Sequence, residues 1–186
     1  AGWLEKIAGF FGIDAKPYLQ KIIANCFEFI CANMVFAVTF EMTAALSLEN
    51  NNTYAVGISE FLAQEAGVQV LMCSVSSAAA AQRLSATCGE ILISPTIEQK
   101  RDAFVQSAAM VIYGNFYDKK VSMDEGFKNF IFADIPTIGY LNTENRPFMG
   151  FMGAKYLVES LVNEVYMGIF LETKGEMMGP ISTGAV

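Results

Sequence analysis

The sequence of 186 residues contains no histidine. Histidine is the commonest general base in enzymes and the commonest transition-metal ligand, so any mechanism within this chain that depends on an imidazole is excluded. Arginine is also scarce, occurring only at Arg83, Arg101 and Arg146, and the net charge is −7. A chain without a basic face cannot neutralise phosphates, so we expect neither nucleic acid nor an anionic membrane surface as a partner.

Long apolar runs and a secretory signal are absent as well. The richest apolar run, residues 26–40, is interrupted by Glu28 and Asn33, whereas a membrane span needs about 20 predominantly apolar residues. The amino terminus lacks the basic start and apolar middle of a signal peptide. It also lacks Met, which indicates a processed or excised chain. We therefore expect a soluble, cytoplasmic protein.

The four cysteines form no C-x-x-C pair, and we expect them to be reduced thiols. Cys26 and Cys31 are five residues apart, which on a helix separates them by about 140°, so they cannot bind one metal together. A dinucleotide site is also not expected, because residues 40–53 contain no glycine and the G-x-G-x-x-G turn is missing.

Hydrophobic residues make up 53% of the chain, and short apolar runs alternate with helical patterns. We expect strands at residues 35–40, 68–73, 90–94, 109–113 and 135–141, and helices at 16–32, from 53 to about 66, 77–87, 95–107 and 148–170. This order predicts an α/β, Rossmann-like, doubly wound, mainly parallel five-stranded sheet with helices on both faces. We divide the chain into an N-terminal helical segment (1–34), the Rossmann-like domain (35–171) and a tail (172–186).

In open α/β sheets, ligands bind at the carboxyl ends of the strands. Three sets of side chains at these ends each allow two interpretations. Glu41 and Glu144 could form an acid–base pair or be solvated loop carboxylates, and Arg146 could clamp an anion or pair with Glu144. Cys73 could face a ligand or belong to the core. We assign no catalytic or metal-binding residue; the candidate cofactor-binding residues are Glu41, Thr43, Cys73, Asn115, Tyr117, Glu144 and Arg146.

Two further features lie outside the predicted strands. Gly150 and Gly153 open the last predicted helix, where a helix N-terminus could attract an anion, but close packing is the favoured interpretation. The chain also has ten Met and fifteen Phe residues, which suggest adaptable apolar surface as well as core. We expect some of them on a surface facing another domain or subunit, with an ordinary core as the alternative; the candidates are Phe10, Phe11, Phe148, Met149, Phe151 and Met152.

Several sequence motifs are similar to those of a known protein family. Residues 111–119 read Val-Ile-Tyr-Gly-Asn-Phe-Tyr-Asp-Lys, residues 135–140 read Ile-Pro-Thr-Ile-Gly-Tyr, and residues 146–154 read Arg-Pro-Phe-Met-Gly-Phe-Met-Gly-Ala. The last of these resembles the R-P-[FY]-M-G-[FY]-x-G-A ending of the component 1 nitrogenase superfamily. With the order of segments, the resemblance covers residues 1 to about 170 and is greatest to β-type subunits and to protochlorophyllide and chlorophyllide reductases.

The resemblance implies the third of three Rossmann-like domains of a nitrogenase-like subunit. It implies a parent α2β2 assembly with an iron–sulfur cluster or metallocofactor, and electrons supplied by an ATP-dependent iron–sulfur reductase. The cluster-ligating cysteines of the family belong to its N-terminal domain, and its cofactor-anchoring His has no counterpart here. We therefore expect no cofactor in this chain alone and partners among the other parent domains and a homologous subunit.

Our first functional hypothesis is a domain that walls a substrate or metallocofactor cavity and is not catalytic alone. The alternative is a stand-alone cofactor-binding or assembly scaffold protein with the same fold, because fold does not fix function. A third possibility is a non-catalytic interaction module, suggested by the Met- and Phe-rich surface.

Overall fold

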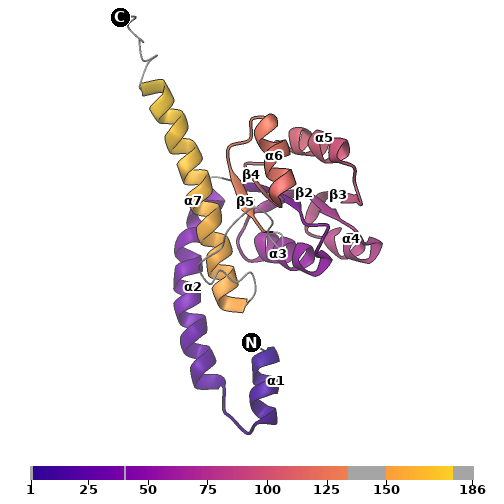
Figure 1. The fold of residues 1–186 in the computed structure, drawn as a ribbon. Coiled ribbons are helices and arrows are strands. Elements are labelled where there is room, and N and C mark those ends of the chain that lie inside the picture. The colour runs from indigo at the N-terminus through magenta and orange to yellow at the C-terminus, as the bar shows by residue number, and fades with distance from the viewer. Residues whose placement is uncertain (1, 40, 134–149, 178–186) are drawn as a thin grey trace, which may run out of the picture.

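A computed structural model describes residues 2–39, 41–133 and 150–177 (Figure 1). Strands and helices alternate through its middle part, and long helices stand at both ends of the chain. The helices are α1 (Gly2–Phe10), α2 (Lys16–Thr39), α3 (Asn52–Gln64), α4 (Ala78–Leu84), α5 (Ile97–Ser107), α6 (Phe116–Asp124) and α7 (Gly150–Met177). The strands are β1 (Thr43–Ser47), β2 (Gln69–Val75), β3 (Cys88–Ile93), β4 (Val111–Gly114) and β5 (Phe130–Phe132).

The five strands form one parallel sheet in the order β3-β2-β1-β4-β5. Buried side chains form a cluster on each face. One joins the sheet to α3, α4 and α7 through residues such as Leu62, Leu84 and Leu161. The other joins it to α5 and α6 through Phe104 and Val121. The predicted α/β architecture, a parallel five-stranded sheet with helices on both faces, is confirmed.

Local sequence explains why the crossover helices begin where they do. The side chains of Asn51, Thr96 and Asn115 each accept a backbone hydrogen bond from the first turn of α3, α5 and α6, respectively. After α3, Gly67 has a φ of +69°, a conformation that glycine adopts at little cost. These residues fix where the crossover helices begin or end, and such helical crossovers are what a parallel sheet requires.

The first predicted strand, residues 35–40, is wrong. Residues 35–39 belong to α2, which packs along α7 outside the sheet (Figure 1). A short apolar run satisfies a helix as well as a strand, so its periodicity could not separate the two. The true first strand is Thr43–Ser47, whose two alanines have low strand propensity but fit at the fully buried centre of the sheet. The boundary predicted between residues 34 and 35 falls inside α2.

The part of the chain after β4 differs from expectation in three further ways. Helix α6 was not predicted, because its sequence has no clear apolar stripe. The fifth strand described in the structure is Phe130–Phe132, whereas the predicted strand at 135–141 lies outside the described residues. Helix α7 continues to Met177, into the predicted tail. Among the described helices, none is both long and apolar enough to cross a membrane.

Candidate functional site

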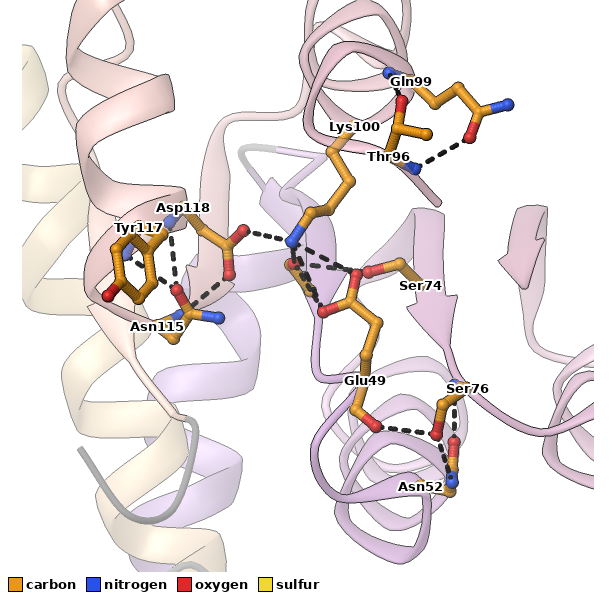
Figure 2. Close-up of polar contacts among 11 residues, drawn as sticks. Glu49, Asn52, Ser74, Ser76, Thr96, Gln99, Lys100, Asn115, Tyr117 and Asp118 are labelled. Carbon is orange, nitrogen blue, oxygen red and sulfur yellow. Dashed lines mark hydrogen bonds and ion pairs between the residues drawn. The ribbon is translucent and has the colours of Figure 1, made fainter. Parts of the chain in front are cut away.

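The strand order places a topological switch point between β1 and β4, because the chain winds from β1 in one direction and from β4 in the other. Ligands of doubly wound proteins bind in the crevice at the carboxyl ends of such strands. Here the side chain of Lys100, from α5, enters that position. It meets polar groups that follow the ends of β1 and β4 (Figure 2).

Lys100 is the centre of a compact ion-pair network. Its Nζ donates to Asp118 Oδ1 at 2.8 Å and to Glu49 Oε2 at 3.4 Å, and lies 3.3 Å from Glu49 Oε1. The same ammonium donates to Ser47 Oγ at 3.4 Å, and Ser74 Oγ donates to Ser47 Oγ at 3.3 Å. We call these five residues the Lys100 cluster. It unites the ends of β1, β2 and β4 with α5.

Burial makes this network energetically important. The Asp118 side chain is 1% exposed, that of Lys100 12% and that of Glu49 17%. Burial alone would lower the pKa of the Lys100 ammonium, but the Asp118 and Glu49 carboxylates outweigh it and hold that pKa above its ordinary value. Burial also raises the pKa of the Asp118 carboxyl, against the opposing effect of Lys100. The cluster therefore keeps a charged lysine where a ligand's charge would otherwise lie.

Asp118 is also part of the N-terminal cap of α6. Its Oδ2 accepts a hydrogen bond from the Asn115 backbone at 3.0 Å, while Asn115 Oδ1 accepts from the backbones of Tyr117 and Asp118 at 2.8 and 3.1 Å (Figure 2). This reciprocal capping box leaves few donors of the first turn for an external anion. Asn115 thus positions Asp118 for Lys100.

Replacing Asn115 with alanine removes the capping oxygen of α6. We expect Asn115→Ala to lower the free energy of unfolding by about 1 kcal/mol, the usual cost of losing an N-cap side chain. Urea denaturation followed by circular dichroism measures this change. The matched control is Asn115→Ser, which retains a capping oxygen and should stay within about 0.5 kcal/mol of the parent. Equal losses in both variants would show that the cap is not what Asn115 contributes.

A second set of contacts ties the loop after β1 to the end of β2. Asn52 and Ser76 exchange two hydrogen bonds of 2.9 Å, from Asn52 Nδ2 to Ser76 Oγ and from the Ser76 backbone to Asn52 Oδ1. Ser76 Oγ also donates to the Glu49 carbonyl oxygen at 2.9 Å. These bonds fix the backbone of Glu49, and with it the carboxylate that faces Lys100 (Figure 2).

Two predicted site residues lie at the wrong edge of the sheet. Because β1 begins at Thr43, both Glu41 and Thr43 lie at its amino end rather than beyond its carboxyl end. Glu41 is exposed and has a φ of +47°, between the end of α2 and the start of β1. Thr43 Oγ1 accepts a hydrogen bond from the Met110 backbone at 3.0 Å, which ties the start of β1 to the chain entering β4. Both predictions followed from the misplaced first strand.

Cys73 proves to be a core residue. It lies within β2, pairs in register with Leu46 of β1 and Ile91 of β3, and is fully buried. Burial raises the pKa of its thiol, and the neighbouring Cys88 thiol and Glu49 raise it further. Burial raises the pKa of Cys88 to about 12. Since the thiolate is the form that binds metals and reacts, neither thiol is suited to either role.

Alkylation tests this assignment of the two thiols. We expect iodoacetamide at pH 8 to leave Cys73 and Cys88 largely unmodified in the folded chain and to modify both in guanidinium chloride, because burial suppresses their thiolate forms. Peptide mass spectrometry after brief exposure gives the extent at each site. Rapid modification of Cys73 in the folded chain would contradict its placement in the core.

The remaining predicted residues divide into two groups. Asn115 and Tyr117 do follow the carboxyl end of β4, where Asn115 is a cap and Tyr117 is 64% exposed in edge-to-face contact with Phe116. Glu144 and Arg146 lie outside the described residues. The sequence analysis missed Lys100, Asp118 and Glu49. The only available signal was Asn115-x-x-Asp118, which has the spacing of a capping box.

A hollow away from this cluster carries little chemistry. It has a volume of about 500 Å³ and lies at the amino ends of β2 and β3, where small and uncharged residues such as Gly67, Thr87 and Gly89 line it. Nor do the described residues contain any group of three or more Cys, Asp or Glu side chains able to hold a metal ion. Among the described residues, we therefore take the Lys100 cluster, with its buried charges at the strand ends, as the candidate site.

Comparison with known proteins gives this architecture a family. The family model for nitrogenase component 1 type oxidoreductases matches residues 1–166. The B-type chain of the light-independent protochlorophyllide reductase is similar over 123 residues, with 24% identity for the protein of Leptolyngbya boryana and 26% for that of Picosynechococcus sp. (strain ATCC 27264 / PCC 7002 / PR-6). Those residues are 64% of this chain but 24% of each relative.

A solved structure, "Nitrogenase Cp1 at pH 6.5", has the same fold with a TM-score of 0.77 at 15% identity. The likeness covers 94% of this chain and 39% of that one. The chain thus spans about a quarter of the length of the curated relatives and two fifths of the solved chain. On the family match over residues 1–166, the chain belongs to the nitrogenase component 1 type oxidoreductases.

Proposed function

We propose that this chain is one α/β domain of a nitrogenase-like oxidoreductase subunit, and that it walls one side of a substrate or metallocofactor cavity. The observation that carries the proposal is the mismatch in length: the family model matches residues 1–166, yet the chain covers 24% of the curated relatives and 39% of the solved nitrogenase chain. Redox chemistry then belongs to the whole subunit, with this domain as a supporting part.

The scarcity of metal-ligating side chains among the described residues fits a domain that does not itself hold the metal. The chain has no histidine, and its described residues include no group of three acidic or thiol side chains in one place. Structural metal sites and clusters usually require about four such ligands. An iron–sulfur cluster or metallocofactor of the assembly does not fit the described residues, so we propose that other parts of the subunit hold it.

The ion-paired Lys100 side chain at the switch point between β1 and β4 supports the same conclusion. Lys100 occupies the crevice with an ammonium already bonded to two carboxylates, so a phosphate or carboxylate ligand would have to displace Asp118, whose side chain is 1% exposed. We therefore propose that the domain contributes surface rather than a nucleotide site. Asn115 and Tyr117 stay candidates for the cavity wall, as do Glu144 and Arg146.

Exposed apolar side chains fit contact with other domains. Phe10 is 85% exposed and Phe11 68%, and Met152 on α7 is 60% exposed. Exposed aromatic and Met side chains are typical of surfaces that bind other proteins. We propose that the other domains of the subunit and a homologous partner subunit cover them. An ATP-dependent iron–sulfur reductase as electron donor and a cytoplasmic location belong to the same proposal.

The coding sequence upstream of Ala1 tests the proposal. We expect an uninterrupted reading frame that encodes two further α/β domains, with cysteines able to ligate a cluster. A stop codon followed by a start codon next to residue 1 would contradict it. That outcome would favour the alternative, a stand-alone cofactor-binding or assembly scaffold protein with this fold.

A further inference from the structure

A pocket with charged side chains in its lining lies at the β5 edge of the sheet. None of its lining residues belongs to the Lys100 cluster. Its volume is about 330 Å³, within the range of small-molecule sites. Strand β5 forms one wall and Lys119 of α6 another, and α7 supplies Tyr156, Ser160, Asn163 and Glu164. Figure 1 shows β5 beside α7, at the end of the sheet away from β3.

Opposite charges face this pocket without neutralising each other directly. Burial raises the pKa of the Glu164 carboxyl above its ordinary value, and the charge of Lys119 opposes this rise. No ion pair within 4.0 Å joins these two side chains in the described structure. Lys119 Nζ instead lies 5.1 Å from the centre of the Phe130 ring. Both charged groups therefore keep bonding capacity for a third partner.

A buried hydroxyl without a partner in the described structure belongs to the strand next to β5. Tyr113 of β4, the strand next to β5, is fully buried, and its hydroxyl oxygen has no hydrogen-bond partner among the described residues. Burial raises the pKa of this hydroxyl, and Tyr156 and Glu164, which both line the pocket, raise it further. Buried hydroxyls in folded proteins nearly always have a partner, so an unpaired one calls for an explanation.

We propose that this pocket binds a small zwitterion of the free amino acid class, with its carboxylate on Lys119 and its ammonium on Glu164. Ser160 and Asn163, which also line the pocket, offer further hydrogen bonds to such a ligand. The two unpaired charges recognise such a ligand together, since a zwitterion satisfies both at once. This site goes beyond the supporting role proposed above and does not depend on it.

Saturation-transfer NMR on the 186-residue chain tests the proposal. One sample contains an equimolar mixture of the standard free amino acids, and a second contains their N-acetyl amides, which lack both charges. We expect transfer to one or a few free amino acids and none to the amides. Calorimetric titration of the responding amino acid then gives its Kd. No transfer to any free amino acid, or equal transfer to the amides, would overturn the proposal.

Four variants locate the binding. Lys119→Met and Glu164→Gln should each raise the Kd by about tenfold or more, because each removes one charge contact. The matched controls are Lys120→Met and Glu159→Gln, neighbouring residues that are exposed and do not line the pocket; they should leave the Kd unchanged. Circular dichroism confirms that each variant is folded. Binding that is equally weakened by the controls, or not weakened by Lys119→Met, would overturn the assignment to this pocket.

Discussion

Lys100→Met should lower the free energy of unfolding by about 3 kcal/mol, the loss typical of breaking a buried ion pair from one side. The variant leaves the carboxylates of Asp118 and Glu49 together without a counter-ion, and Asp118 is almost fully buried. Guanidinium denaturation at pH 7 measures the loss. The matched control is Lys120→Met, which removes an exposed lysine and should change stability by less than about 0.5 kcal/mol.

The deficit of Lys100→Met should shrink as the pH falls from 7 to 5. In the parent, burial already raises the pKa of the Asp118 carboxyl, and Lys100 opposes that rise. Without Lys100, the folded-state pKa rises further above the unfolded value, so the folded variant takes up more protons than the unfolded chain and gains stability on acidification. A deficit that does not change with pH would mean that lost packing, rather than unpaired charge, causes it.

A double variant separates charge from packing. Lys100→Met combined with Asp118→Asn removes the cation and the most buried anion together while retaining an oxygen that can cap α6. Replacing both partners of a buried pair is often close to neutral, so we expect the double variant to recover more than half of the loss. A double variant as unstable as the sum of the two single variants would show that the two side chains act independently.

Phe104→Ala should lower the free energy of unfolding by about 4 kcal/mol, as for other fully buried phenylalanines. Phe104 belongs to the apolar cluster that joins α5 to β1, β2 and β4, through Ala45, Met72 and Ile112. The same helix carries Lys100, so the packing of Phe104 also brings the ammonium to the switch point. Thermal or denaturant unfolding measures the effect.

The adjacent residue offers a matched control for this prediction. Val105 lies one position further along α5 and is 50% exposed, so Val105→Ala should cost less than about 0.5 kcal/mol. Similar losses for Phe104→Ala and Val105→Ala would mean that α5 does not pack on the sheet through the face described. They would also remove the structural basis for placing Lys100 at the switch point.

The alternation of strands and helices was readable from the sequence because most elements carry their own signals. The apolar run of β2, the turn at Gly67 and the Thr96 cap are local features that tertiary packing reinforced. The first strand was missed because Ala44 and Ala45 resemble helix formers when taken alone. Their burial at the centre of the sheet, which favours small side chains there, is a property of the fold rather than of the segment.

The Lys100 cluster could not be predicted for a different reason. Lys100, Glu49 and Asp118 lie far apart in the sequence, and a lysine on an amphipathic helix is ordinarily expected in solvent. Only the sheet order reveals that α5 brings it over the ends of β1 and β4. Even a correct prediction of every strand would have placed ligand-binding residues here, because the usual rule for doubly wound sheets does not anticipate a side chain in the crevice.

We propose that this chain supports redox chemistry held elsewhere in a larger subunit. Metal analysis with an absorption spectrum, on chain purified anaerobically and supplied with iron and sulfide, tests it most directly. We predict a colourless, metal-free protein of 20.3 kDa. Stoichiometric iron with a charge-transfer band would contradict the claim, because the chain would then hold a cluster through its own thiols.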